Sequence, residues 1–161
     1  MVTLAGLRHP THGMVVMAKR FSLGEAETLL PVLEALVVRA QGAMSRSAEL
    51  ELEMETLNRR IVLSGGMHVD LRSAALRRAE REKAVQEASS AATEIGEIGA
   101  KIHDLDAGML DIPFQREGEA MMLCWKVGER SIEYWHEETE EPVERRSLDG
   151  RFGRGERKRP N

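Results

Sequence analysis

Residues that could do chemistry gather in the last third of the chain. Carboxylates and a histidine recur there at short spacing, and these groups suit a hard or borderline divalent metal ion. A divalent metal is therefore the one cofactor that the sequence suggests. The candidate ligands are Asp104, Asp106, Asp111, His136 and Glu137.

The three aspartates also allow a purely structural interpretation. They lie in and after a turn, so their side chains could converge on an ion, but their spacing matches no known metal motif. Aspartate side chains also accept hydrogen bonds from nearby backbone N–H groups, which would cap the preceding helix and hold the turn. The sequence leaves both interpretations open.

Cys124 and His136 suggest a thiol nucleophile with its base. A two-residue turn at Gly128 and Glu129 would pair Met121 with His136 across a hairpin. Residues two apart share a face of a strand, so this register puts Cys124 and His136 on opposite faces. We therefore predict no catalytic residue and interpret Cys124 as a small packing residue. The sequence argues against an enzyme but leaves that question open.

Two long helical segments must position these residues. Ser22 and Glu25 form a capping box at the start of the first, and a four-three apolar rhythm predicts a helix over 22–63. Ser64, Gly65 and Gly66 then end it. Asp70 can cap a second helix, and a heptad pattern that continues to Leu105 predicts this helix over 70–104.

Charges on the two segments predict an antiparallel hairpin. Reversing the chain near Gly66 places Glu51 level with Arg81 and Glu55 level with Arg77. Opposite charges near the turn and apolar residues further away favour an intramolecular helix pair. After it, two-residue alternation predicts a small β-unit over 108–138. One face of this unit would pack on the hairpin, and it carries Met121, Leu123, Trp125, Val127, Ile132 and Tyr134. The fold class is thus mainly α with a small β-part: a long, coiled-coil-like antiparallel helical hairpin followed by a small antiparallel sheet.

Composition argues against some classes of function. The net charge is −4 with 31% charged residues, so no strong positive field attracts nucleic acid. No apolar run approaches the ~20 residues that span a bilayer, and the chain has one cysteine, so we predict a cytoplasmic protein that does not insert into membranes. Residues 1–20 form a flexible leader, 21–144 a single domain and 145–161 a disordered, Arg-rich tail.

Four segments, in order, resemble the bacterial family catalogued as domain of unknown function 2203: FSLGEAETLLPVLEAL, DLDAGMLDIPF, LCWKVGE and YWHEE. The resemblance runs from about Phe21 to Arg146, with Ile112 where the family pattern has Phe. It implies that the following positions belong to the family pattern: Asp106, Gly108, Asp111, Pro113, Cys124, Trp125, Gly128, Glu129, Trp135, His136 and Glu137. No activity comes with the family.

These observations favour a non-enzymatic oligomerisation or scaffold module. Thin, elongated helical elements carry more apolar positions than they can bury alone, which indicates a homo-oligomer, most simply a dimer, or another protein partner. The first alternative is a divalent-metal-binding protein that uses the carboxylate and histidine cluster. The second is nucleic-acid contact through the Arg-rich tail, which is disfavoured because that stretch is nearly free of aromatic residues.

Overall fold

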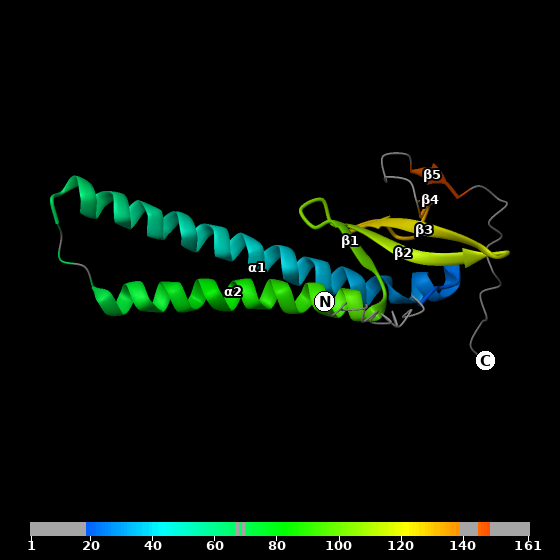
Figure 1. Ribbon diagram of the computed structural model, residues 1–161, viewed down its shortest axis with the longest axis horizontal. Helices are drawn as coiled ribbons and strands as arrows, with labels where there is room; N and C mark the ends of the chain where they lie inside the picture. The colour runs from blue at the N-terminus through cyan, green and yellow to red at the C-terminus, as the bar shows by residue number, and fades with distance from the viewer. Residues whose placement is uncertain (1–18, 67, 69, 139–144, 149–161) are drawn as a thin grey trace, which may run out of the picture.

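The computed structural model describes residues 19–66, 68, 70–138 and 145–148. Two helices, α1 (Leu23–Leu63) and α2 (Leu71–Ile98), lie side by side and precede a five-stranded antiparallel sheet (Figure 1). The strands are β1 (Lys101–Asp104), β2 (Met109–Arg116), β3 (Glu119–Lys126), β4 (Tyr134–Glu137) and β5 (Arg146–Ser147). This confirms the predicted fold class. Of the helices in the described residues, none is both long and apolar enough to cross a membrane.

Both helices begin at the predicted caps. The Ser22 hydroxyl accepts a hydrogen bond from the Glu25 backbone N–H at 3.2 Å, and the Glu25 carboxylate accepts one from the Ser22 N–H at 2.8 Å. At the second helix, the Asp70 carboxylate accepts from the Arg72 N–H at 3.0 Å. These contacts satisfy backbone donors that have no partner inside a helix.

Ion pairs between α1 and α2 set the hairpin register. Arg39 with Glu94 and Arg46 with Glu87 each meet at 2.5 Å, and the predicted pair of Glu51 and Arg81 also forms. The other predicted pair is wrong: the partner of Arg77 is Glu53, at 3.7 Å. Each exposed pair contributes only about 0.2–1 kcal/mol, so these contacts select the register more than they stabilise it.

The prediction that the second helix reaches residue 104 is wrong. It ends at Ile98, because Gly99 adopts a left-handed conformation with φ 110° and turns the chain into β1. The heptad pattern continued past this point because Ile102 and Leu105 are also apolar. They still pack against the core, but from β1 and the following turn.

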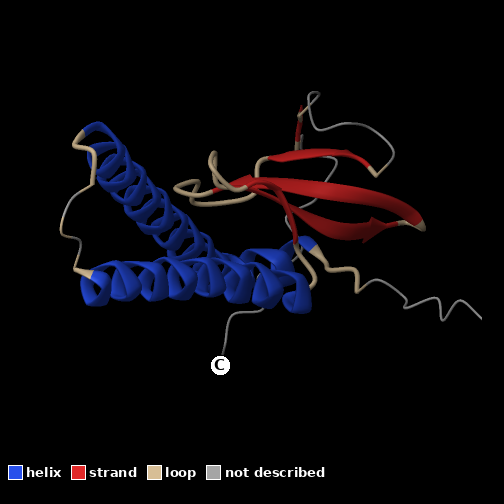
Figure 2. Ribbon diagram, turned by 60° about the vertical axis from the view of Figure 1, so that its left-hand side comes forward, coloured by secondary structure: helices blue, strands red, loops and turns tan. Residues whose placement is uncertain are grey.

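The sheet covers one half of the helical hairpin. Its strands follow one another in chain order, and the sheet stands against the start of α1 and the end of α2 (Figure 2). Side chains from β2 and β3 interlock with those of the helices in one apolar cluster. Its buried members include Leu33, Val37, Ile95, Leu110, Ile112, Leu123 and Trp125. The other half of the hairpin extends away from the sheet.

The β3–β4 pairing differs from the predicted two-residue hairpin. Leu123 pairs with Trp135 and Met122 with His136, one residue out of the expected register. The connection spans residues 127–133, and in it Glu129 accepts hydrogen bonds from the Trp125 indole and the Lys126 backbone N–H, both at 2.9 Å. Relative to the predicted register, this one-residue shift places every β4 side chain on the opposite face of the sheet.

The ordered part of the chain extends beyond the predicted domain boundaries at both ends. Residues 1–18 of the predicted leader lie outside the described residues, whereas Lys19 sits over the Phe21 ring and Arg20 pairs with Glu138 at 3.1 Å. The predicted tail does not start at residue 145, because β5 pairs with β4 and the Leu148 N–H donates to the Glu133 carbonyl at 2.8 Å. The rest of that Arg-rich segment, 149–161, lies outside the described residues.

The joint between α2 and β1 gives a stability prediction. A Cβ on Gly99 would lie 3.1 Å from the Phe21 ring in a backbone conformation that side chains disfavour. We expect Gly99→Ala to destabilise the protein by about 1–3 kcal/mol.

Gly96 lies within α2, and a Cβ added there would have no other atom within 4 Å, so Gly96→Ala is the matched control. It should instead stabilise by about 0.5–1 kcal/mol, because alanine favours helix. Urea unfolding of both variants measures the two signs, and equal signs would contradict this account of the joint.

Candidate metal centre

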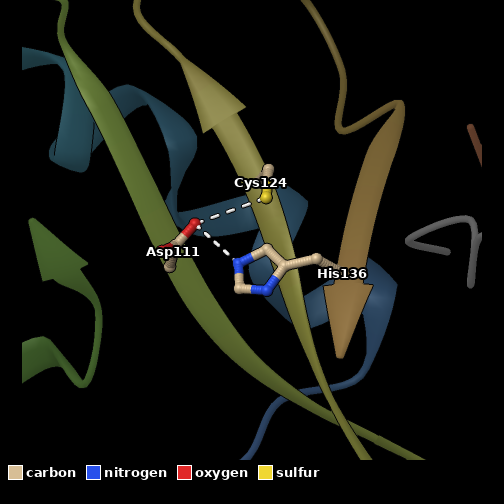
Figure 3. A group of neighbouring side chains, drawn as sticks. All are labelled: Asp111, Cys124 and His136. Carbon is tan, nitrogen blue, oxygen red and sulfur yellow. Dashed lines mark hydrogen bonds and ion pairs between the residues drawn. The ribbon is translucent and has the colours of Figure 1, made fainter. Parts of the chain in front are cut away.

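Three neighbouring strands bring together Asp111, Cys124 and His136. Asp111 in β2 pairs directly with Cys124 in β3, and His136 in β4 pairs with Met122, two residues before Cys124. All three side chains therefore lie on the sheet face turned away from the core cluster. Figure 3 shows them pointing toward one another from the three strands.

The ligating atoms of this trio are close and buried. Asp111 Oδ1 lies 3.3 Å from Cys124 Sγ and 3.4 Å from His136 Nε2, and all three residues offer atoms within 4.8 Å of one another. Cys124 is fully buried, and Asp111 and His136 are the buried polar or charged residues of the described part of the chain. Buried polar groups cost free energy unless they are paired, so this placement requires an explanation.

The His136 ring has one nitrogen that is satisfied and one that is not. Nδ1 lies 2.7 Å from the Glu137 carbonyl oxygen, which can only accept, so Nδ1 carries a proton. Nε2 then points at the cluster, is buried, and has no hydrogen-bond partner. It faces Asp111 Oδ1, another acceptor, at 3.4 Å, so a proton or a cation between the two atoms would satisfy both.

The Cys124 thiol is protonated in the metal-free protein. Burial, followed by the negative charge of Asp111 and its hydrogen bond with the thiol, raises the pKa of Cys124 to about 12, against a smaller opposing effect of Arg145. Such a thiol is a poor nucleophile. Asp111 Oδ1 accepts its hydrogen bond, so the thiol donates to a carboxylate rather than to the imidazole that a cysteine nucleophile would need as its base.

Two further basic side chains border the trio. His103 Nδ1 lies 3.8 Å from Asp111 Oδ2, the oxygen not used by Cys124 and His136. Arg145 stacks over the Tyr134 ring at 4.4 Å and reaches the Glu129 carboxylate at 3.4 Å. His103 from β1 and Arg145, the residue before β5, thus lie beside the trio.

Of the predicted ligands, only Asp111 and His136 come together. Asp104 Oδ1 accepts from the Ala107 N–H at 2.9 Å, the structural role that we left open, and Asp106 is exposed at the turn. The Glu137 side chain pairs with Arg146 at 3.2 Å, away from the trio, although its backbone carbonyl orients His136.

The prediction put the third member, Cys124, on the correct face of the sheet and put His136 on the wrong one. The assumed two-residue turn shifted β4 by one residue and separated Cys124 from His136. A signal for the true register was present in β4 itself. If Trp135 faces the core with Leu123, then Tyr134 and His136 must face outward with Cys124, which is the observed arrangement.

The chain matches one protein-family model. A family model described as an uncharacterised conserved protein, DUF2203, matches residues 19–148. The chain belongs to this family. The DUF2203 match includes both helices, all five strands and the three residues of the trio. No curated protein and no solved structure gives a match to the chain.

The thiol gives a pH prediction. A pKa raised from 9.0 in the unfolded chain to about 12 in the folded one means that the thiol stabilises the fold below pH 9, and that this contribution is lost as pH rises toward 12. The free energy of unfolding of metal-free protein should therefore fall above pH 9 by at most about 1.4 kcal/mol per pH unit from this group. Cys124→Ala should lack this part of the slope in urea titrations from pH 8 to about 10.5. Equal slopes in both proteins would show that the thiol is not held protonated.

Proposed function

We propose that this protein binds a divalent transition-metal ion, of the zinc class, through Asp111, Cys124 and His136. The observation that carries the proposal is the buried His136 Nε2, which has no hydrogen-bond partner and faces Asp111 Oδ1 at 3.4 Å. A cation bound by both atoms would satisfy the lone pair and the carboxylate together. A hydrogen bond from the other ring nitrogen to a carbonyl oxygen is also how metal-binding histidines are commonly oriented.

The donor set and its spacing support this proposal. Carboxylate oxygen, thiolate sulfur and imidazole nitrogen are all zinc ligands. Tetrahedral bonds of about 2.0–2.3 Å place neighbouring ligand atoms roughly 3.3–3.8 Å apart. The separations from Asp111 Oδ1 to Cys124 Sγ and to His136 Nε2, 3.3 and 3.4 Å, fall in this range.

Binding must release protons. The thiol that donates to Asp111 has to become a thiolate, and any second proton on His136 has to leave. One carboxylate and one thiolate then neutralise a divalent ion, which lowers the cost of burying the charges. Arg145 assists this step, because its positive charge lowers the pKa of the Cys124 thiol. A cytoplasmic location belongs to the proposal, since a reducing compartment keeps a lone thiol available.

Metal content tests the proposal. We expect one Zn²⁺ or Co²⁺ per chain by elemental analysis, and binding that weakens as pH falls. At a Zn²⁺ concentration 100 times the Kd, the protein should gain about 2.7 kcal/mol of stability. This gain should raise the Tm by roughly 5–10 °C. Asp111→Asn, Cys124→Ser and His136→Asn should each abolish stoichiometric binding.

Asp106→Asn is the matched control. It removes an exposed carboxylate from the turn before β2 and leaves the trio intact, so it should keep full metal content. No bound metal and no metal-dependent rise in Tm would refute the proposal. Equal losses in the control and in Asp111→Asn would assign the metal to exposed carboxylates instead.

We also propose that the protein self-associates through the half of the hairpin far from the sheet. Between Ala43 and Ala84, no residue that the structure describes is buried. Apolar side chains are nevertheless present there, with Leu63 80% and Leu71 79% exposed. Such an apolar surface favours a partner.

Charge complementarity favours a second copy as this partner. On the distal part of α1, Glu49 and Glu55 take no part in the ion pairs that the hairpin makes through Glu51 and Glu53. On α2, Arg72 and Arg78 likewise lie outside those pairs, which use Arg77 and Arg81. In an isologous dimer, α1 of one copy can lie against α2 of the other, so each surface meets its complement.

Light scattering during size exclusion checks this second proposal. The wild-type protein should be a dimer at micromolar concentration, and the double variant Leu63→Lys with Leu71→Lys should be a monomer of unchanged helicity. Val38→Lys, at an exposed position on the sheet-proximal half, should remain a dimer. A monomeric wild type, or a double variant that dimerises like wild type, would rule it out.

A further inference from the structure

The trio supplies three ligands, and His103 lies next to it on the remaining side. His103 comes from β1, the neighbour of β2, and its Nδ1 is 3.8 Å from Asp111 Oδ2. The other two partners of Asp111 contact its Oδ1. Asp111 is therefore the centre of the group, with Cys124 and His136 at one oxygen and His103 at the other.

The backbone of β1 is irregular at this residue. Ile102 pairs with Leu110, but the next pairing joins Asp104 to Met109, so two residues of β1 oppose one of β2. Such a bulge changes the direction of the inserted side chain. The bulge falls at His103, and it brings the imidazole toward a carboxylate on the neighbouring strand.

Coordination chemistry leaves one position for this histidine. Zinc bound entirely by protein groups is almost always tetrahedral, with four ligands. His103 Nδ1 lies 3.8 Å from Oδ2 of the carboxylate whose Oδ1 faces Cys124 and His136, and it is outside the set of ligand atoms that already lie within 4.8 Å of one another, so its ring would turn toward the ion on binding. The His103 side chain is 37% exposed, so it has freedom to close the remaining gap, whereas the other three ligands are buried.

We infer that His103 is the fourth protein ligand, which makes the centre a closed Asp-Cys-His-His site with no position for substrate. The inference rests on the proposed metal site and goes one step further. Closed sites contribute folding free energy, whereas zinc sites with three protein ligands keep a position for water or substrate. His103 therefore decides between a structural and a reactive role for the same metal ion.

Cobalt substitution tests the inference in the full-length protein. Thiolate-to-cobalt charge transfer reports Cys124 ligation, and the d–d bands report the coordination number and any exchangeable ligand. Added imidazole should leave the wild-type d–d bands unchanged. In His103→Ala the Co²⁺ affinity should fall at least about 10-fold, since even loss of an outer partner costs that much. Added imidazole should then alter the d–d bands, because the open position accepts it.

His68→Ala is the matched control, because His68 is exposed and belongs to the connection between α1 and α2, which lies at the end of the hairpin away from the sheet (Figure 1). It should behave as wild type in both measurements. Unchanged affinity in His103→Ala, with bands that respond to imidazole in both proteins or in neither, would overturn the role of His103 and leave the three-residue metal site standing. Absence of the charge-transfer band in wild type would instead refute the metal site itself.

X-ray absorption of the wild-type zinc protein gives a second measurement that does not depend on a variant folding. Multiple scattering from imidazole rings should count two histidines and the zinc shell should contain one sulfur. One histidine with one sulfur would contradict the role of His103. A shell of oxygen alone would contradict the proposed metal site.

Discussion

The alternation of side chains across β2, β3 and β4 is the constraint on which both the core and the candidate centre depend. Leu110, Ile112, Leu123 and Trp125 face the helices, and this fixes the direction of every residue between them. Asp111 and Cys124 must then face the other way, on adjacent strands. The strand pairing that buries the apolar side chains therefore also brings the Asp111 carboxylate and the Cys124 thiol together, and no further structural element is needed to position them.

The outer face of the sheet differs from an ordinary solvent-facing one. Met122 and Cys124 are buried there, together with Asp111 and His136, although the apolar core is on the other side. A protein that only needed to cover its helices would leave such positions polar and wet. Burial of a carboxylate beside an imidazole lone pair has a cost that a proton or a metal ion must offset. The centre is therefore recognised by its buried, incompletely paired polar groups, and not by a sequence motif.

Much of the fold could be predicted from the sequence because its signals are local. The capping box at Ser22, the turn at Gly65 and Gly66 and the pair of Glu51 with Arg81 each depend on nearby residues or on a simple reversal. The centre depends on a register that the sequence specifies only indirectly. The β3–β4 connection, in which Glu129 accepts hydrogen bonds from Trp125 and Lys126, is longer than the expected two residues, and the resulting register places His136 on the face of Cys124. Likewise, the heptad pattern could not predict that α2 ends before Gly99, because apolar residues continue at the same spacing after this left-handed glycine.

The two proposed activities lie at opposite ends of one hairpin and need not interfere. Core residues are buried on α1 up to Ala43 and on α2 from Ala84 onward. Beyond them the two helices carry half-buried apolar side chains, among them Leu50, Met54 and Leu57, together with exposed ion pairs. The metal ligands all come from the sheet, at the end that packs tightly. No described residue of the distal half is fully buried, so this part of the hairpin offers no tightly packed contact that could switch between two arrangements. If both proposals hold, metal binding and self-association should therefore be thermodynamically independent, because the hairpin separates the two proposed sites.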